Sequence, residues 1–257
     1  MRGSVAWVAV APVKALRLAL VDEVQLTGTG PVGDRRFFLV DEKGRLVNNK
    51  GLGVLQQVRP SYDDVARTLA LHLPDGEVVA GEVELGDEIE TSFWDEPKGA
   101  RRVVGPWSDA LSMLAGRRLQ LVAPADGAAV DRGSRGAATL VSTRALDELG
   151  SRLGVDAVDG RRFRMHFGID GVPAHAEDGW LGRRVRIGGA VVVPRGNVGR
   201  CAVTTQNPET GRPDLGTLKA LAAYRGNMEA TEPLPFGVYA EVVEPGAVRL
   251  GDPVETQ

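Results

Sequence analysis

Short apolar runs separated by turn residues dominate the hydrophobic pattern of this chain. Alternating leucines before Pro74-Asp75-Gly76, and two valines after it, predict a hairpin, because proline presets one turn dihedral and glycine tolerates positive ones. Pro245-Gly246, between the apolar residues 238–243 and 248–250, predicts a second hairpin on the same grounds. Further strands are expected at residues 5–10, 37–40, 83–85, 119–122, 139–141, 185–187 and 191–193.

A few segments carry the spacing of a short helix. Ser108 or Asp109 would cap the first of them, and Gly116 would end it. The second has leucines at positions i, i+3 and i+7, which share one helical face. The helices are expected from about Trp107 to Leu114, from Ser142 onward, and from Asp214 to near Tyr224. Because strands and helices do not alternate regularly, the pattern favours an α+β protein with a closed or nearly closed antiparallel sheet.

Composition supports this strand-rich interpretation. The 33 glycines and 15 prolines among 257 residues suit many short strands joined by turns and argue against a helical bundle. Residues 123–135 are rich in Ala, Gly, Asp and Arg and have no periodicity, which is typical of a loop or a domain junction. We therefore expect two domains, residues 1–125 and residues 126–257.

Charge and special residues exclude several classes of function. The formal net charge is −3, from 31 Lys plus Arg and 34 Asp plus Glu, and this balance does not indicate nucleic-acid binding. The single cysteine permits no intrachain disulfide, and the three histidines lack the spacing of a zinc site. No signal peptide and no run of about 18 apolar residues is present, so we expect a cytoplasmic protein without a membrane span.

Gly28, Gly30 and Gly33 spell G-x-G-x-x-G, the pattern of a dinucleotide-binding loop. That loop requires a strand before it and a helix after it, because the helix N-terminus holds the pyrophosphate. Here Pro31 lies inside the pattern and residues 36–40 are strand-like. We therefore interpret the glycines as a turn that enters a strand.

The strongest motif lies in the second half of the chain. Residues 199–205 read Gly-Arg-Cys-Ala-Val-Thr-Thr, and residues 207–211 read Asn-Pro-Glu-Thr-Gly. Together they resemble the R-C-x-x-T-T-x-x-P-x-T-G signature of the MOSC family of molybdenum-cofactor proteins, which includes amidoxime-reducing components and their bacterial relatives. The signature is long and mixed in residue type, so a chance match is improbable.

Other segments resemble the same family in the same order along the chain. Together they cover nearly the whole sequence. The resemblance implies an α+β, strand-rich fold, with a β-barrel-like MOSC domain, an N-terminal MOSC β-barrel domain and a few short helices. The matching segments are P-V-K at 12–14, D-R-x-[FW]-x-V from 34, F-R at 163–164, E-D-x-W at 177–180, L-K with Y-R at 218–219 and 224–225, and G-D-x-V at 251–254.

The resemblance implies a site for the molybdenum cofactor, a metal held by molybdopterin, with Cys201 as the metal ligand and catalytic residue. A thiolate is a soft ligand suited to molybdenum, and the charge of Arg200 would favour the thiolate. The phosphate of the pterin suits lysine and bidentate arginine side chains. The residues assigned to cofactor binding by the resemblance are Lys14, Arg36, Arg164, Arg200, Thr204, Thr205 and, in place of the family's asparagine, His166.

Several positions depart from the family's pattern. Met165-His166 replaces Pro-Asn, Ala15 and Gly199 each replace a serine, and residues 48–51 replace a segment that contains Arg-Gln in reductases of this family. Each change removes or exchanges a polar contact at the expected cofactor site. A lone cysteine without context is more often a small buried hydrophobe, so the assignment of Cys201 depends on its motif.

The activity implied by the resemblance is that of an oxidoreductase. It would remove oxygen from N-hydroxylated compounds such as amidoximes, hydroxamic acids or hydroxylated bases, with the metal cycling between Mo(VI) and Mo(IV). With one cysteine, the chain holds no four-cysteine iron–sulfur domain, so electrons are expected from a separate ferredoxin-, flavodoxin- or cytochrome-type protein. Two alternatives stay open: sulfur transfer through a persulfide on Cys201, although no pyridoxal-dependent domain is attached, and non-catalytic cofactor binding.

Overall fold

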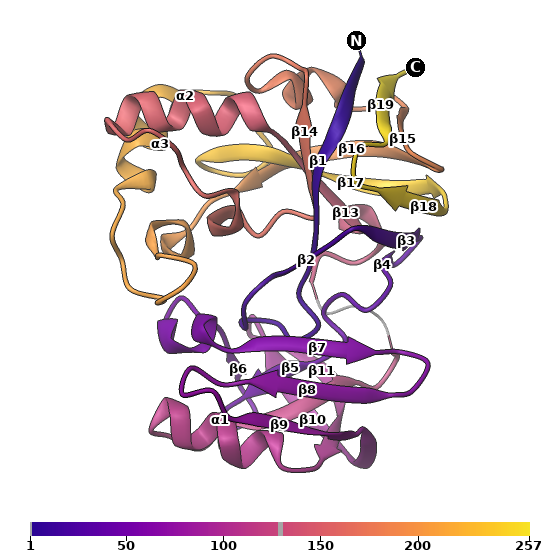
Figure 1. Cartoon of the computed structure of the whole chain (residues 1–257), viewed down its shortest axis with the longest axis vertical. Coiled ribbons are helices and arrows are strands. Elements are labelled where there is room, and N and C mark those ends of the chain that lie inside the picture. The colour runs from indigo at the N-terminus through magenta and orange to yellow at the C-terminus, as the bar shows by residue number, and fades with distance from the viewer. Residues whose placement is uncertain (1, 128–130) are drawn as a thin grey trace.

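Two strand-rich units lie one above the other along the long axis of the molecule (Figure 1). The computed structural model describes residues 2–127 and 131–257. The lower unit in Figure 1 is built from strands of the first half of the chain, and the upper unit from strands of the second half together with the first four strands, which lie within residues 2–31. The α+β fold with β-barrel domains and short helices, expected from the sequence, is confirmed.

The upper unit is a closed barrel. Within the described residues its ring holds seven strands, and β1 closes it by pairing with β14 on one side and β19 on the other. β2 (Ala19–Val21) pairs with the far end of β1. In ring order the strands are β14 (Phe167–Asp170), β13 (Ala138–Ser142), β17 (Pro235–Glu244), β16 (Ala190–Gly199), β15 (Val185–Ile187), β19 (Pro253–Thr256) and β1 (Arg2–Val10).

β-Branched side chains fill this barrel. Val5, Ile169, Val192 and Val238 come from four different strands and share one buried core. Branching at Cβ restricts the side chain and favours the extended backbone, so these residues both form the strands and pack between them.

The lower unit consists of two sheets on a second core that contains Leu39, Leu71 and Trp107. A bridge between Arg45 and Ser92 brings the two edges of the larger sheet together, so this sheet curls toward a barrel. The larger sheet is β10 (Glu84–Phe93), β11 (Glu96–Val104), β12 (Gln120–Pro124), β5 (Phe38–Val40) and β6 (Leu46–Val47), and the smaller one is β7 (Arg59–Asp63), β8 (Thr68–His72) and β9 (Val78–Glu82).

The three expected helices are present among the described residues. α1 (Trp107–Ala115) ends at Gly116 in the left-handed conformation, as predicted, but begins at Pro106 without a side-chain cap, and Ser108 Oγ accepts from Leu121 N instead. Ser142 caps α2 (Thr143–Leu153) through its side chain. α3 (Thr217–Arg225) begins three residues after the predicted start. The 3₁₀ turns are η1 (Gly53–Gln57), η2 (Ser134–Gly136), η3 (Gly160–Phe163), η4 (Ala176–Trp180) and η5 (Ala202–Thr205).

The hairpin predicted at residues 74–76 is confirmed as β8–β9, but the one predicted at Pro245-Gly246 is wrong. Gly246 is already the first residue of β18 (Gly246–Arg249), so Pro245 alone separates β17 from β18. One residue cannot reverse the chain into a two-stranded ladder. β18 pairs instead with β3 (Glu23–Thr27), which continues to β4 (Gly30–Pro31).

Gly28 and Gly33 lie in the turns on either side of β4, Gly30 is the first residue of β4, and a strand, β5, follows them in place of a helix, as the sequence predicts. In space, the strand at residues 2–10 belongs with strands that follow residue 138, so a cut near residue 125 would separate β1 from its partners. No helix in the part of the chain that the structure describes is both long and apolar enough to cross a membrane.

Candidate functional site

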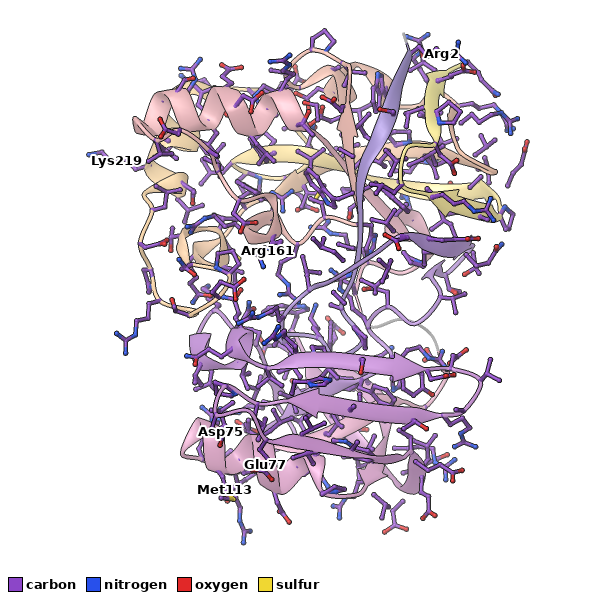
Figure 2. All side chains as sticks on the ribbon, in the orientation of Figure 1. Arg2, Asp75, Glu77, Met113, Arg161 and Lys219 are labelled. Carbon is purple, nitrogen blue, oxygen red and sulfur yellow. The ribbon has the colours of Figure 1, made fainter. Side chains whose placement is uncertain are left out.

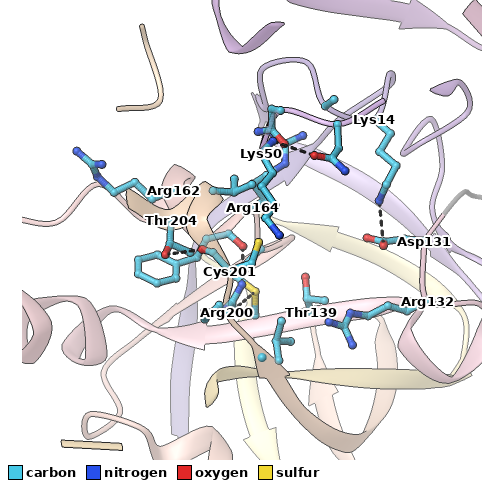
Figure 3. Close-up of a pocket in the computed structure, with 18 of the residues that line it drawn as sticks. Lys14, Lys50, Asp131, Arg132, Thr139, Arg162, Arg164, Arg200, Cys201 and Thr204 are labelled. Carbon is cyan, nitrogen blue, oxygen red and sulfur yellow. Dashed lines mark hydrogen bonds and ion pairs between the residues drawn. The ribbon is translucent and has the colours of Figure 1, made fainter. Parts of the chain in front are cut away.

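A cavity of about 190 Å³ lies where the two units meet (Figure 3). Lys14 and residues 48–50 line it from the first half of the chain, and Arg164 and Cys201 line it from the second half. Arg161, on the turn that carries Arg164, lies at the level between the two units in Figure 2. The cavity therefore exists only when both units are folded and in contact.

Cys201 lies between the end of β16 and η5, on the signature loop. Its backbone is extended, and its carbonyl accepts hydrogen bonds from both the N–H and the hydroxyl of Thr204, each at 3.1 Å. The hydroxyl of Thr205 donates to the carbonyl of Ala202 at 2.7 Å. The two threonines thus fold the loop into a tight turn that leaves the thiol of Cys201 exposed at the cavity.

The far end of the signature loop is attached to the lower unit. Gly211 has a φ of 70°, and a Cβ on it would lie 1.8 Å from the carbonyl oxygen of Gly53. The side chain of Gln206 donates to the carbonyl of Asn49 at 2.9 Å and accepts from the side chain of Gln56 at 2.6 Å. The glycine that ends the signature is therefore needed for a close contact between the units, since any side chain at Gly211 would push them apart.

Positive side chains greatly outnumber negative ones around the cavity. Among the lining residues that the structure describes, the one acid is Asp131. An uncharged ligand would gain nothing from this excess, whereas a phosphate or another multiply charged anion would be held strongly. The cations are Lys14, Arg35, Lys50, Arg132, Arg162, Arg164 and Arg200.

Arg164 differs from the other arginines of the cavity in that its side chain has no ion pair or hydrogen bond to a described residue, although Arg162 Nε is also buried without a partner. Arg35 pairs with Asp131 at 3.0 Å and Arg162 with Asp214 at 2.7 Å. The Nη2 atom of Arg164 is buried and has no hydrogen-bond partner among the described residues. A buried donor without a partner costs about 1–3 kcal/mol, and more when it is charged, so its retention indicates a ligand that supplies the missing acceptor.

Burial and mutual repulsion act on the pKa values of this cluster. Burial, with a further contribution from the charge of Arg35, lowers the pKa of Arg164 to about 10. Burial and the charge of Arg132 lower the pKa of Arg200 to about 9. Both values lie above 7, so both guanidinium groups remain charged near neutral pH. The cavity therefore holds positive charge at a cost to the folded protein.

Backbone strain is concentrated at the same place. In the described chain, eight residues other than glycine have a positive φ, and four of them line this cavity. Such conformations cost about 1 kcal/mol or more each and persist where the surroundings or the function require them. The four are Ala15 (80°), Arg35 (46°), Trp94 (56°) and Arg164 (54°).

The structure brings together five of the residues that the sequence assigned to the site. Figure 3 shows Lys14, Arg164, Arg200, Cys201 and Thr204 around one cavity. Arg200 also holds the loop: it donates to the carbonyl of Phe163 at 2.9 Å and, through Nε, to that of Phe236 at 2.9 Å.

The other three assigned residues lie outside the cavity lining. Arg36 donates to the carbonyl of Gly127 at 2.9 Å and pairs with Asp64 at 3.4 Å, on another face. Thr205 stays within the loop, as described above. His166 is buried, and its Nε2 lies 3.0 Å from Asp34 and 2.7 Å from Arg35. His166 therefore acts on the cavity through the position of Arg35.

Arg35 is the residue that sequence reasoning missed beside Arg36. The signal was present, because the D-R-x-[FW] pattern fixes the arginine directly after the aspartate, and that residue is Arg35. Asp131 and Arg132 were also missed, since they lie in a segment without periodicity that was interpreted as a junction. Trp94 was missed because it lies at the tip of the hairpin between β10 and β11, and no motif marks it.

Glu177, on η4, is a further buried charge behind the site. It has 0% exposure, and neither carboxylate oxygen has a hydrogen-bond partner among the described residues. Burial, reinforced by the charge of Asp178, raises the pKa of Glu177 from 4.5 to about 7. A raised carboxyl pKa means that the folded state prefers the protonated form, so this group destabilises the fold as pH rises from about 4.5 and does so fully above about 7.

We expect Glu177→Gln to remove this pH dependence. The gain in free energy of unfolding relative to the natural protein should be larger at pH 8 than at pH 4 by about 3 kcal/mol, the equivalent of the pKa shift. Urea unfolding at the two pH values measures it, and other titrating groups cancel in the comparison. An equal difference at both pH values would show that Glu177 has an ordinary pKa.

The geometry defines a class of protein: a two-barrel scaffold with a cationic cavity between its units and one exposed thiol in it. Cys201 is the one thiol, and no cluster of three or more His, Cys, Asp or Glu side chains in the described ranges could hold a metal ion. A metal at Cys201 would therefore have to arrive with its other ligands already attached.

The chain belongs to the MOSC family, which is associated with binding of the molybdenum cofactor. The family model for the MOSC domain matches residues 128–255, and the model for the MOSC N-terminal beta barrel domain matches residues 2–106. The resemblance found in the sequence is thereby confirmed.

Two similar proteins carry the name mitochondrial amidoxime-reducing component 1. The chain is 36% identical to that of Mus musculus over 121 residues and 33% identical to that of Homo sapiens over 125 residues, which is 45% of this chain in each case. The matched part spans about a third of each relative, 35% of its length. The YuaD protein from Bacillus subtilis has a similar fold, with a TM-score of 0.52 at 14% identity, covering 100% of this chain and 96% of that one.

Proposed function

We propose that this protein binds the molybdenum cofactor in the cavity between its units and uses it to reduce N-hydroxylated compounds. The observation that supports this best is the buried excess of positive charge around an exposed thiol, with Arg164 Nη2 lacking an acceptor. The cofactor has the two complementary features: a phosphate that accepts charge-assisted hydrogen bonds and a metal that accepts a thiolate.

The residues present fit this group. Lys14, Arg35 and Arg164 would bind its phosphate and other anionic oxygens, and Arg164 would gain the partner it lacks. Cys201 would be the metal ligand, presented by the turn that Thr204 and Thr205 fold. The guanidinium of Arg200, the residue next to Cys201, donates hydrogen bonds to backbone carbonyls and not to the thiol. In the described structure the thiol is therefore free to bind a metal.

When bound, the molybdenum centre supplies a two-electron redox couple for the removal of an oxygen atom. In the overall reaction the N–O bond of the N-hydroxylated substrate breaks, two electrons and two protons are consumed, and the products are the N–H compound and water. The chain's own side chains bind the cofactor, orient it and supply the thiolate. We propose that a separate donor protein delivers the electrons, as the resemblance to the MOSC family implies.

The alternative roles in sulfur transfer and in non-catalytic cofactor binding use the same cavity. An exposed thiol beside a charged arginine would also suit a persulfide. Molybdenum in the purified protein distinguishes sulfur transfer from the other two roles, and turnover of an N-hydroxylated substrate distinguishes catalysis from binding alone.

The first test is the molybdenum content of the protein purified from a host rich in the cofactor. We expect a ratio approaching one molybdenum per chain, together with a stoichiometric amount of pterin, measured by elemental analysis and by fluorescence of the oxidised pterin. A known molybdenum-cofactor protein prepared in parallel is the positive control. A folded protein with a ratio near zero beside a loaded control would refute the proposal.

A further inference from the structure

A second cavity adjoins the cationic one. Its volume is about 370 Å³, and it shares Asn48 and Trp94 with the first cavity. The rest of its lining comes from the lower unit, mainly from the β5–β6 turn, the segment after β6 and the β10–β11 hairpin. The two cavities are therefore neighbours, and Asn48 and Trp94 line both of them.

Trp94 is exposed and strained where it lines the two cavities. Trp94 is 61% exposed, whereas Trp107 is only 1% exposed and Trp180 only 3%. It forms a two-residue turn with Asp95, and both have a positive φ, 56° and 66°. Such turns favour Asn-Gly, so a tryptophan costs backbone strain as well as exposed apolar area.

Among the residues that the structure describes, no ring contact or shared core explains this cost. Trp94 makes an edge contact with the neighbouring Phe93, at 6.1 Å between ring centroids, and belongs to no buried core. Most of its indole surface faces the two cavities and the solvent. A large exposed aromatic side chain at the edge of a cavity is the usual means of binding a planar ligand by stacking.

The charges of the second cavity differ from those of the first. Asp41 and Asp95 are matched by Arg45 and Arg117, and Asp41 pairs with Arg45 at 2.8 Å. This balance gives a multiply charged anion no advantage. The first cavity thus suits an anionic cofactor, and the second suits an uncharged molecule with a flat apolar face.

We propose that Trp94 is a specificity-determining residue: it stacks on the planar part of an uncharged aromatic substrate in the second cavity and directs the substrate's N–OH group toward the thiol of Cys201. The orientation of the N–OH group for reduction rests on the proposed function, whereas the binding of the substrate by Trp94 does not. The substrate class is therefore aryl-substituted N-hydroxylated compounds in preference to small aliphatic ones.

Binding can be tested without turnover. Acrylamide quenches exposed tryptophans, so the difference between the natural protein and Trp94→Phe isolates the signal of Trp94. We expect benzamidoxime to protect this signal from quenching and acetamidoxime, which has no ring, to leave it unchanged. Equal protection by both compounds, or protection by neither, would overturn the stacking role whether or not the protein holds molybdenum.

Kinetics of the cofactor-loaded protein give the second test. Trp94→Ala should raise KM for benzamidoxime roughly tenfold, in line with the effect of removing an aromatic stacking partner. We expect kcat for benzamidoxime and both constants for acetamidoxime to stay within about twofold, and Trp94→Phe to restore most of the lost affinity.

Met113→Ala is the matched control, because Met113 is 83% exposed and lies at the lower end of the molecule, away from the level where the two units meet (Figure 2). Met113→Ala should leave KM and kcat unchanged for both substrates. An equal loss for both substrates in Trp94→Ala would indicate a merely structural role and contradict the inference. A protein without molybdenum or turnover would refute the proposed function instead, and the quenching experiment would still decide the role of Trp94.

Discussion

Cys201→Ala is expected to abolish turnover of N-hydroxylated substrates while most of the pterin stays bound. The cationic side chains that would hold the phosphate are unchanged in this variant, so pterin content should remain above about half of the natural level. The loss of turnover should exceed the 10- to 100-fold typical of residues that merely orient a metal ligand, because the ligand itself is removed. Steady-state reduction of benzamidoxime and pterin per chain measure the two effects.

Because the side chain of Cys201 is exposed, its removal should leave the fold intact, which a thermal melt of the cofactor-free protein checks. Cys201→Ser should behave like the alanine variant, since a hydroxyl is a harder and more weakly acidic ligand than a thiol. Turnover that survives in Cys201→Ala would show that the thiol is not the ligand and would remove the main argument for the site.

Arg164→Met is expected to change stability and cofactor binding in opposite directions. Methionine keeps much of the length and apolar volume of the side chain but removes a buried charge without a partner, so the cofactor-free protein should gain about 1–2 kcal/mol in free energy of unfolding. The same change removes charge-assisted hydrogen bonds to the cofactor. When the natural protein and the variant compete for a limited amount of cofactor, the pterin content of the variant should be lower by about tenfold or more. Urea unfolding at pH 7 and pterin per chain measure the two.

Arg36→Met is the matched control for Arg164→Met, because it makes the same substitution at an arginine that lies outside the cavity lining. It should leave pterin content unchanged and should not stabilise the protein. If Arg36→Met lowers pterin content as much as Arg164→Met does, the cavity between the units is not the binding site. If Arg164→Met destabilises the cofactor-free protein, its guanidinium has a partner within the fold.

Local pattern was enough to predict the helices and most strands. Leucines at helical spacing after Ser142 and the glycine at 116 are signals that depend on neighbours in sequence, and the structure confirms both. The Pro245-Gly246 hairpin failed because the destination of β18 is decided by β3, more than 200 residues away in sequence. No local propensity reports such a pairing.

The site divides in the same way. The residues of the signature loop could be predicted from the motif, because the loop is folded by local contacts. The hydrogen bonds from Thr204 and Thr205 join residues that are three positions apart in sequence, around Cys201. The choice between Arg35 and Arg36 depends on which side of the chain faces the second unit. Trp94 reaches the site from the lower unit, so only the contact between units reveals it. Binding by any of these residues stays a prediction.

Closure of the upper barrel also has a consequence for folding kinetics. β1 (residues 2–10) lies in the ring between β14 and β19, so it cannot pair until strands that are made more than 150 residues later are available. Contacts of such high contact order form slowly. The lower unit can collapse before these strands are made, whereas the barrel that carries Cys201 is complete only once β19 has been made. Cofactor insertion is therefore expected to follow the pairing of β1 with β14 and β19, which closes the barrel.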